Sequence, residues 1–320
     1  FEMGSPGRKA YSLPSCDVPE VEIDTLLPPS EIREAIDELP ELTELDVVRH
    51  YTRLSQWNFN IDTNFYPLGS CTMKYNPKIN ETLARLPGFA QHHPMTPDSD
   101  SQGSLQLMYE LQECLKTISG MDHASLQPAA GAQGEFAGML MIQAYHSANG
   151  NPRKKVLLPD SAHGTNPASA TLCGYKPVQL PSNAEGTIDV AKLEAAMDEE
   201  TAAIMLTNPN TLGMFEKDIL KICEIVHKKG GLVYCDGANL NAIMGIAKMG
   251  DMGIDVLHIN LHKTFSTPHG GGGPGAGPVC IKDILEPYLP APIVEIAGSS
   301  YKLNADRPDS VGRLKSFNGN

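Results

Sequence analysis

The chain has 320 residues, of which 41% are hydrophobic and 20% charged, and its formal net charge is −13. This composition is typical of a globular protein with a large core, and it excludes a small module held together by disulfides. The acidic balance and the lack of a Lys- and Arg-rich stripe argue against a nucleic-acid partner.

The first part of the chain, residues 1–102, is predicted to be an N-terminal arm. Apolar spacing indicates helices over Ser30–Leu39 and Thr43–Trp57. Thr43 and Asp46 have the spacing of a capping box, in which each residue bonds the backbone of the other. From Asn58 to Gln102 the sequence is rich in loop-forming residues.

Residues 103–290 are predicted to form one large domain. Leu105, Met108, Leu111, Leu115 and Ile118 recur at helical spacing, and Gly120 follows where a helix C-cap belongs. Beyond this helix, strands and helices alternate. The predicted strands are Ala124–Leu126, Lys155–Leu158, Val178–Leu180, Ala203–Leu206, Leu232–Cys235, Val256–Ile259 and Val279–Ile281, and the helices between them are Gln133–Ala148, Asp189–Met197 and Phe215–Lys229.

Alternation of this kind, with nearly continuous apolar strands, predicts an α/β fold with a mainly parallel sheet covered on both faces. Ligands bind such sheets at the carboxyl ends of the strands. The pattern stops soon after Leu289, and residues 291–320 are expected to begin a small C-terminal domain that is cut or only started here.

Two reactive residues follow neighbouring predicted strands. Asp236 ends the strand Leu232–Cys235, and Lys263 follows the strand Val256–Ile259. An amine that forms an imine with an aldehyde, and an anion that keeps a pyridine nitrogen protonated, are what pyridoxal-phosphate (PLP) chemistry needs. Taken singly, Lys263 could be a solvated charge and Asp236 a turn residue.

A small-residue turn, Ala129 to Glu135, lies between a predicted strand and the helix that opens near Gln133. Backbone N–H groups at a helix N-terminus bind phosphate, and small side chains allow a close approach. Ordinary helix capping is the alternative interpretation.

Two histidines are further candidates. His163 follows the strand Lys155–Leu158 and could stack on a cofactor ring, or it could be a hydrogen-bonded turn residue. His262 precedes Lys263 and could orient that amine, or it could be a core histidine.

The segment from Gly270 to Gly277 contains six glycines and fits G-x-G-x-x-G. A dinucleotide fingerprint requires a strand before it and a helix after it, whereas this segment precedes a strand. A mobile lid over the site suits the glycines better. His92 and His93 lack a third ligand at metal spacing, so no metal site is predicted.

The seven cysteines include no C-x-x-C pair, which indicates free thiols in a reducing compartment. No signal peptide and no apolar stretch of membrane-spanning length are visible. The expectation is a cytoplasmic protein without a membrane partner, or an organellar one if a transit peptide has been removed.

Several long motifs resemble the glycine cleavage system P-proteins, the glycine dehydrogenases (decarboxylating), and in particular the second, PLP-carrying subunit of the two-subunit forms. The motifs begin at Phe65 (FYPLGSCTMKYNP), Leu126 (LQPAAGAQGE), Asp160 (DSAHGTNPAS), Thr207 (TNPNTLG), Tyr234 (YCDGANLNA) and Asn260 (NLHKTFSTPHGGGGPG).

The resemblance implies the aminotransferase-like fold (PLP fold type I) with a seven-stranded-type sheet. It implies PLP as cofactor, with Lys263 as the Schiff-base lysine, Asp236 as the partner of the pyridine nitrogen and His163 as the stacking group. The remaining implied contacts are Ala130, Gly131, Ala132 and Gln133 for the phosphate, and Thr207, Ala238 and His262 along the cofactor.

The implied reaction is decarboxylation of glycine, with transfer of the aminomethyl group to the lipoyl arm of H-protein. The implied partners are glycine, lipoylated H-protein and the first subunit, in a heterotetramer of two copies of each chain. The alternatives are a cysteine desulfurase, which would need Cys71 as a mobile nucleophile, an aminotransferase, or a silent partner subunit. Lys263 and Asp236, both present, argue against the silent subunit.

Overall fold

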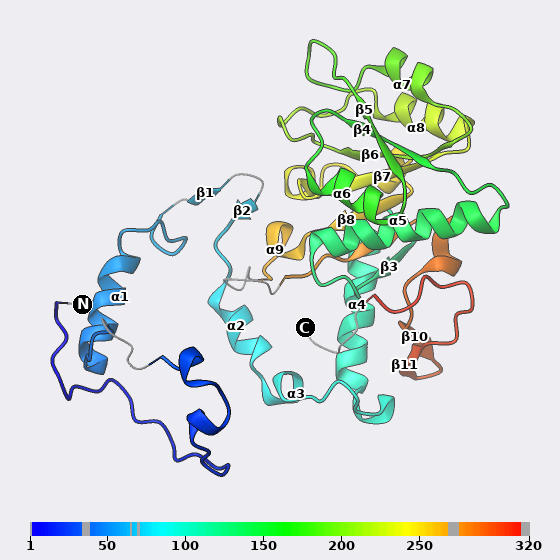
Figure 1. Cartoon of the computed structure of the whole chain (residues 1–320). Coiled ribbons are helices and arrows are strands. Elements are labelled where there is room, and N and C mark those ends of the chain that lie inside the picture. Colours follow the sequence, from blue (N-terminus) through cyan, green and yellow to red (C-terminus); the bar gives the residue numbers. More distant parts are fainter. Residues whose placement is uncertain (1, 34–38, 65, 69–70, 268–274, 315–320) are drawn as a thin grey trace. The chain divides into compact units, whose positions relative to one another are not determined.

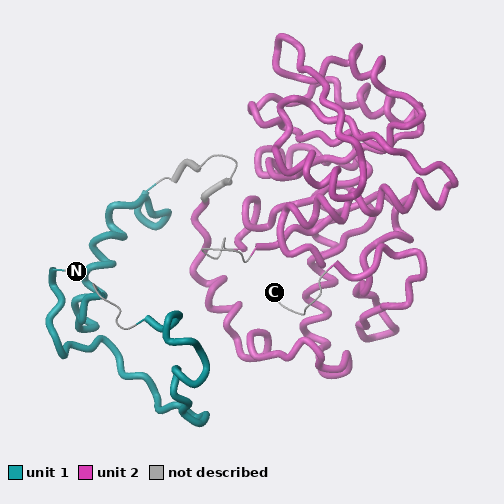
Figure 2. The backbone as a smooth tube through the Cα atoms, viewed as in Figure 1, with its two compact units in different colours: residues 1–66 teal, residues 67–320 magenta. Residues whose placement is uncertain are grey.

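The computed structural model describes residues 2–33, 39–64, 66–68, 71–267 and 275–314, with only the backbone described for the strands at 66–68 and 71–73. The chain divides into two compact units, residues 1–66 and 67–320 (Figure 2). The predicted division at residues 102 and 290 stays a prediction. In the described part of the chain, no helix has the length and apolar character needed to cross a bilayer.

Unit 1 contains short 3-10 helices at Ile23–Thr25 and Pro29–Glu31 and one longer helix, α1 (Glu44–Ser55). The predicted capping box is confirmed, because Thr43 Oγ1 accepts the Asp46 N–H and Asp46 Oδ2 accepts the Thr43 N–H. The helix predicted over Ser30–Leu39 cannot be followed along its length, since residues 34–38 lie outside the described residues.

The stretch predicted to be loop-rich contains more regular structure than expected. Strands β1 (Tyr66–Leu68) and β2 (Cys71–Met73) pair, and helices α2 (Lys78–Ala84) and α3 (Pro87–Ala90) follow. Neither helix has a side-chain cap, because each starts after a residue, Pro77 or Leu86, that offers no side-chain oxygen. Both helices therefore lack the usual sequence signature of a helix start.

Unit 2 is built on a seven-stranded sheet in the order β3-β9-β8-β7-β6-β4-β5 (Figure 1). In that order the strands are β3 (His123–Ser125), β9 (Val279–Ile281), β8 (Val256–Ile259), β7 (Leu232–Gly237), β6 (Thr201–Thr207), β4 (Lys155–Pro159) and β5 (Lys176–Leu180). Strand β9 runs in the direction opposite to that of the other six strands. The predicted mainly parallel sheet is confirmed, and the predicted strands shift at their ends by at most two residues.

Helices cover both faces of the sheet and create two hydrophobic cores. On one face, α4 (Gln102–Ser119), α7 (Val190–Ala196) and α8 (Ile219–Lys228) contribute buried side chains to the first core. On the other face, α5 (Gly131–Ala148) and α6 (Thr165–Leu172) contribute to the second (Figure 1). Strand residues alternate between the cores, as the two-residue period of a strand requires. In β7, Val233 and Cys235 face the first core, and Leu232 and Tyr234 face the second.

Glycines on α5 set how closely this helix lies on the sheet. A Cβ added at Gly138 would stand 2.8 Å from Val256 Cγ1 in β8, and one added at Gly134 would stand 3.0 Å from His258 Cβ. Real Cβ atoms do not approach that closely, so larger residues would push the helix away. Glycine within a helix costs about 1 kcal/mol relative to alanine, and the close packing of α5 on β8 offsets that cost.

Three further features of unit 2 depart from the predictions. Helix α6 was not predicted, because Pro167 interrupts the pattern, although proline is tolerated in the first helical turn. Helix α8 starts at Ile219 rather than Phe215, because Glu216 is buried and its carboxylate accepts the Ile188 N–H. Strands β10 (Ile293–Ala297) and β11 (Ser300–Asn304) form a hairpin after the sheet.

Helix α8 is linked to the sheet by an ion pair that makes a pH-dependent contribution. His227 Nε2 lies 2.7 Å from Asp255 Oδ2, which also accepts the Val233 N–H. The hydrogen bond to Asp255 raises the pKa of His227, against the lowering effect of burial. A raised folded pKa stabilises the fold fully below the unfolded value of about 6.5, and this stabilisation is lost as the pH rises through the folded pKa.

We therefore expect His227→Gln to lower the free energy of unfolding most at about pH 5.5 and least at about pH 8.5. Because the His227 side chain is 39% exposed, solvent screening keeps the electrostatic difference below about 1 kcal/mol. Urea unfolding of the wild type and the variant at both pH values measures this difference in the free energy of unfolding. An equal loss of stability at the two pH values would show that the charge plays no part.

Candidate active site

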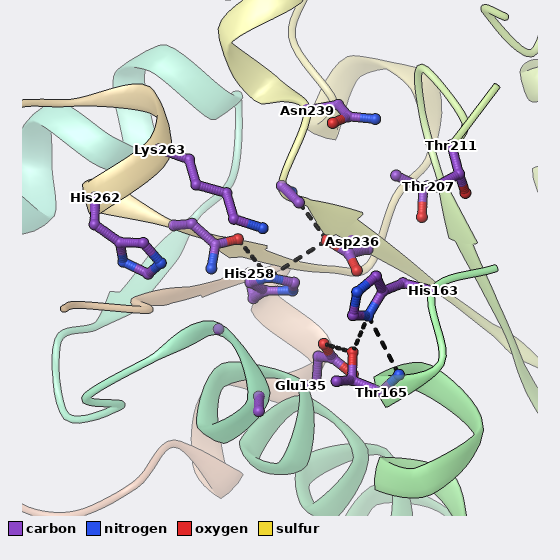
Figure 3. Close-up of a pocket in the computed structure, with 14 residues that line it drawn as sticks. Glu135, His163, Thr165, Thr207, Thr211, Asp236, Asn239, His258, His262 and Lys263 are labelled. Atoms are coloured by element: carbon purple, nitrogen blue, oxygen red, sulfur yellow. Dashed lines mark hydrogen bonds and ion pairs between the residues drawn. The ribbon is translucent and has the colours of Figure 1, made fainter. Parts of the chain in front are cut away.

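The carboxyl ends of β4, β6, β7 and β8 surround a cavity of about 210 Å³ (Figure 3). The sequence-predicted residues that line it are Gly131, Ala132, His163, Thr207, Asp236, Ala238, His262 and Lys263. Figure 3 shows that Lys263, Asp236 and His163 reach toward the same space from three different segments. Two predicted contacts, Ala130 and Gln133, are not in the lining of this cavity.

Asp236 lies at the base of the cavity and is 3% exposed. Its Oδ1 accepts the Ala238 N–H at 2.9 Å and lies 3.4 Å from His258 Nε2, while its Oδ2 accepts Asn166 Nδ2 at 3.1 Å. A carboxylate offers about four acceptor positions. These three contacts therefore leave acceptor capacity for a ligand that carries an N–H.

The surroundings of Asp236 favour its ionised form. Burial by itself raises the pKa of this carboxyl, but His258, the Ala238 N–H, Asn166 and Lys263 together outweigh burial and lower it. Asp236 is consequently an anion at neutral pH inside a low-dielectric site, where its interaction with a cation is stronger than in water.

Lys263 lies on α9 (Leu261–Thr264), a single helical turn that directly follows β8. The Lys263 N–H bonds the Asn260 carbonyl, which fixes the backbone from which the amine extends. A second amine lies nearby, because Lys74 Nζ donates to the His262 carbonyl at 3.1 Å. Lys74 does not belong to the cavity lining.

The N-terminus of α5 forms one wall of the cavity. The N-cap, Ala130, has no side chain that could bond the first N–H groups of the helix, and Gly131 and Ala132 line the cavity directly. The Gln133 side chain turns away, since its Oε1 accepts the Ala129 N–H and its Nε2 donates to the Leu314 carbonyl. This helix end suits an anion, with Gln133 available only through its backbone.

His163 is exposed at the mouth of the cavity and is hydrogen-bonded on one side. Its Nδ1 lies 2.8 Å from Thr165 Oγ1, which donates to Glu135 Oε1 at 2.7 Å. Glu135 is 3% exposed, and its other oxygen accepts Ser169 Oγ. The imidazole is thereby tied to a buried carboxylate on α5 through one hydroxyl.

Sequence reasoning missed several residues that line the same cavity: Glu135, Thr165, Thr211, Asn239, His258 and Asn260. One signal was available for His258, because it is a polar residue within the apolar strand Val256–Ile259. No comparable signal marks Glu135 and Thr165, since their partners come from distant parts of the chain.

Comparison with known proteins identifies the family. The model of the family described as "Glycine cleavage system P-protein" matches residues 21–305. The probable glycine dehydrogenase (decarboxylating) subunit 2 of Halalkalibacterium halodurans is 58% identical over all of this chain, and that of Exiguobacterium sibiricum is 59% identical. The chain spans 66% and 65% of the lengths of these two relatives.

Solved structures agree on the fold. The glycine decarboxylase (P-protein) of the glycine cleavage system, in inhibitor-bound form, matches 88% of this chain and 63% of its own, with a TM-score of 0.70 at 24% identity. Oryza sativa TDC, solved with PLP and tryptamine, matches 92% of this chain and 65% of its own, with a TM-score of 0.60 at 13% identity. Unit 2 therefore has the fold type I architecture of PLP-dependent enzymes, and the chain belongs to the glycine cleavage system P-protein family.

Proposed function

We propose that this chain binds pyridoxal 5′-phosphate through Lys263 and is the cofactor-carrying part of a glycine decarboxylase. One observation carries the proposal: an amine, an anionic carboxylate and an uncapped helix N-terminus open into a single cavity. Family membership supports the choice of glycine as the substrate among the reactions that such a site could perform.

The residues present fit the cofactor. Thr207 Oγ1 is buried at the cavity and has no hydrogen-bond partner among the described residues, so a ligand can satisfy it. Asp236 would hold the pyridine nitrogen, Gly131 and Ala132 the phosphate, and His163 the ring, with Thr207, Ala238 and His262 lining the cofactor. When bound, PLP withdraws electrons from the carbon that loses the carboxyl group.

The protein's own residues would perform three tasks in this reaction. Lys263 would hold the cofactor's aldehyde carbon and exchange a proton with the substrate's amine. Asp236 would keep the ring nitrogen protonated, because it is an anion held by three partners. His163, tied to Glu135 through Thr165, would have a fixed ring plane against the cofactor.

We further propose a role for this chain in the whole glycine cleavage reaction, which the relatives' name, glycine dehydrogenase (decarboxylating), supports. The reaction would decarboxylate glycine and transfer the aminomethyl group to the lipoyl arm of H-protein in the cytoplasm. The relatives' name, "subunit 2", supports a first subunit as partner. We propose two copies of each chain in the assembly. The exposed apolar side chains of α1, including Leu45, Val48 and Tyr51, suit the arm to covering such a partner.

An absorption spectrum tests the cofactor assignment. PLP added to the purified chain should produce an imine band that borohydride bleaches, and peptide mapping of the reduced protein should find the label on Lys263. A label on another lysine would overturn the assignment.

An exchange assay tests the reaction and the partners. We expect exchange of labelled carbon dioxide into glycine to be slow with this chain and PLP alone, because a water-accessible site weakens its electrostatics. The rate should rise when the first subunit and lipoylated H-protein are added. Full activity from the chain alone would contradict this division of labour. Residues 270–274 of the glycine lid predicted at 270–277 lie outside the described residues, so the lid stays a prediction.

A further inference from the structure

A buried tyrosine–histidine pair lies beneath the cavity, and the proposed function does not use it. Tyr234 is 0% exposed and His258 1% exposed, and Tyr234 Oη lies 2.5 Å from His258 Nδ1. On its other side, His258 Nε2 lies 2.9 Å from Asn260 Oδ1 and 3.4 Å from Asp236 Oδ1. Two cavity residues therefore meet at one imidazole nitrogen (Figure 3).

The strand pairing brings these groups together. Asp236 and His258 are register partners on β7 and β8, so their side chains stand on the same face of the sheet. Tyr234 stands on that face too, because it precedes Asp236 by two residues in β7. Helix α5 covers this face through its glycines, which excludes water from the group.

The hydrogen-bond partners determine where the imidazole carries its proton. The Asp236 carboxylate can only accept a hydrogen bond, so His258 Nε2 must be protonated to interact with it. The Tyr234 hydroxyl has no other hydrogen-bond partner among the described residues, and it can donate to Nδ1. Both nitrogens are then satisfied by a neutral ring.

The charged groups facing this pair are Asp236 on β7, Glu135 on α5 and Lys263 on α9. The ligand atoms of Glu135, Asp236 and His258 all lie within 4.8 Å of one another. Glu135 already accepts Thr165 Oγ1 and Ser169 Oγ, and His258 is hydrogen-bonded through both nitrogens. Hydrogen bonds within the chain thus account for the cluster.

We propose that Tyr234 and His258 are positioning residues: the Tyr234 hydroxyl fixes His258 as the Nε2–H tautomer, and that N–H holds the Asp236 carboxylate and the Asn260 carboxamide in place for the cofactor. The part concerning the cofactor rests on the proposed function. Because Asn260 Oδ1 is turned to His258, the amide nitrogen of Asn260 is left as a donor at the cavity. The opposite tautomer would set the Nε2 lone pair against Asp236, which burial makes unfavourable.

The first test reads the tautomer in the protein without cofactor. Nitrogen-15 NMR of histidine-labelled protein should show His258 as a single neutral tautomer protonated on Nε2, identified by the signals that His258→Asn removes. In Tyr234→Phe, Asp236 still requires the proton on Nε2, but Nδ1 loses its hydrogen-bond donor, so the Nδ1 signal should shift. Tyr175→Phe is a matched control, because Tyr175 is also buried and its hydroxyl has no partner among the described residues. A proton on Nδ1 in the wild type, or an unchanged signal in Tyr234→Phe, would overturn the proposal.

The second test reads the effect on the ligand without the chemistry of Lys263. The probe is 4′-deoxypyridoxine 5′-phosphate, which has no aldehyde and cannot form an imine, and its binding is measured by calorimetry over a range of pH. Tyr234→Phe should weaken binding by about five- to tenfold, as expected for one hydrogen bond lost from a buried network, and Tyr175→Phe should leave it unchanged. Tyr234→Phe should also change the pH dependence of binding.

The two tests separate this inference from the proposed function. Equal binding of the probe by the wild type and Tyr234→Phe would overturn the positioning role while leaving the cofactor site intact. Failure of the wild type to bind the probe would overturn the proposed function and the cofactor half of the inference. The NMR measurement would still decide whether Tyr234 fixes the tautomer of His258, since it needs no ligand.

Discussion

Lys263→Ala should abolish the borohydride-trapped linkage and lower the rate of decarboxylation by a factor of about 10² to 10⁴, the range that one positioned acid–base group supplies. The fold should persist, because Lys263 contributes its backbone, not its side chain, to the turn of α9. Near-ultraviolet circular dichroism and the unfolding midpoint establish whether the variant keeps the wild-type fold. Mass spectrometry after reduction establishes whether the linkage is lost.

Lys74→Ala is the matched control for this variant. Burial lowers the pKa of Lys74, which favours the neutral, nucleophilic form of its amine, and Lys74 contacts the residue next to Lys263. Geometry favours Lys263, because only Lys263 lines the cavity with Asp236. Lys74→Ala should therefore keep the linkage. If the trapped linkage were lost in Lys74→Ala and retained in Lys263→Ala, Lys74 would be the lysine that binds the cofactor.

Asp236→Asn should fold and bind PLP but lose about 10²- to 10³-fold in rate, the loss typical of removing one preorganised electrostatic contact. An amide is neutral and cannot keep the ring nitrogen charged. The substitution also replaces one acceptor oxygen with a donor, which would face the donors from Ala238, His258 or Asn166. The measurement is the single-turnover rate at saturating glycine with the partner proteins present.

Asp255→Asn separates this effect from the general cost of removing a buried carboxylate. Asp255 is 6% exposed and directly precedes β8, but its partners are His227 and Val233 on the opposite face of the sheet from the Asp236 network. Asp255→Asn should lower stability with little change in rate. A rate in Asp236→Asn as high as that in Asp255→Asn would remove Asp236 from the mechanism.

Much of the large unit could be predicted because its signals are local. The apolar strands and the left-handed cap at Gly120 each depend on residues close in sequence, as does the Thr43–Asp46 capping box of unit 1. The start of α8 could not be predicted in this way, because Glu216 is drawn out of the helix by the backbone of Ile188. Helix α6 was missed because it contains Pro167. Proline is tolerated in a helix only in the first turn, and only the structure shows that Pro167 lies there.

The sequence by itself determined the alternation of strands and helices, and with it the edge of the sheet at which Asp236 and Lys263 would meet. Strand ends of a parallel sheet converge at one edge, so the order of elements was sufficient for that step. Only the tertiary structure decided which side chains complete the site. The bonds from Tyr234 to His258 and from Thr165 to Glu135 join different strands or helices, and the glycines of α5 matter only against β8. Such contacts depend on register and helix distance, which no local pattern encodes.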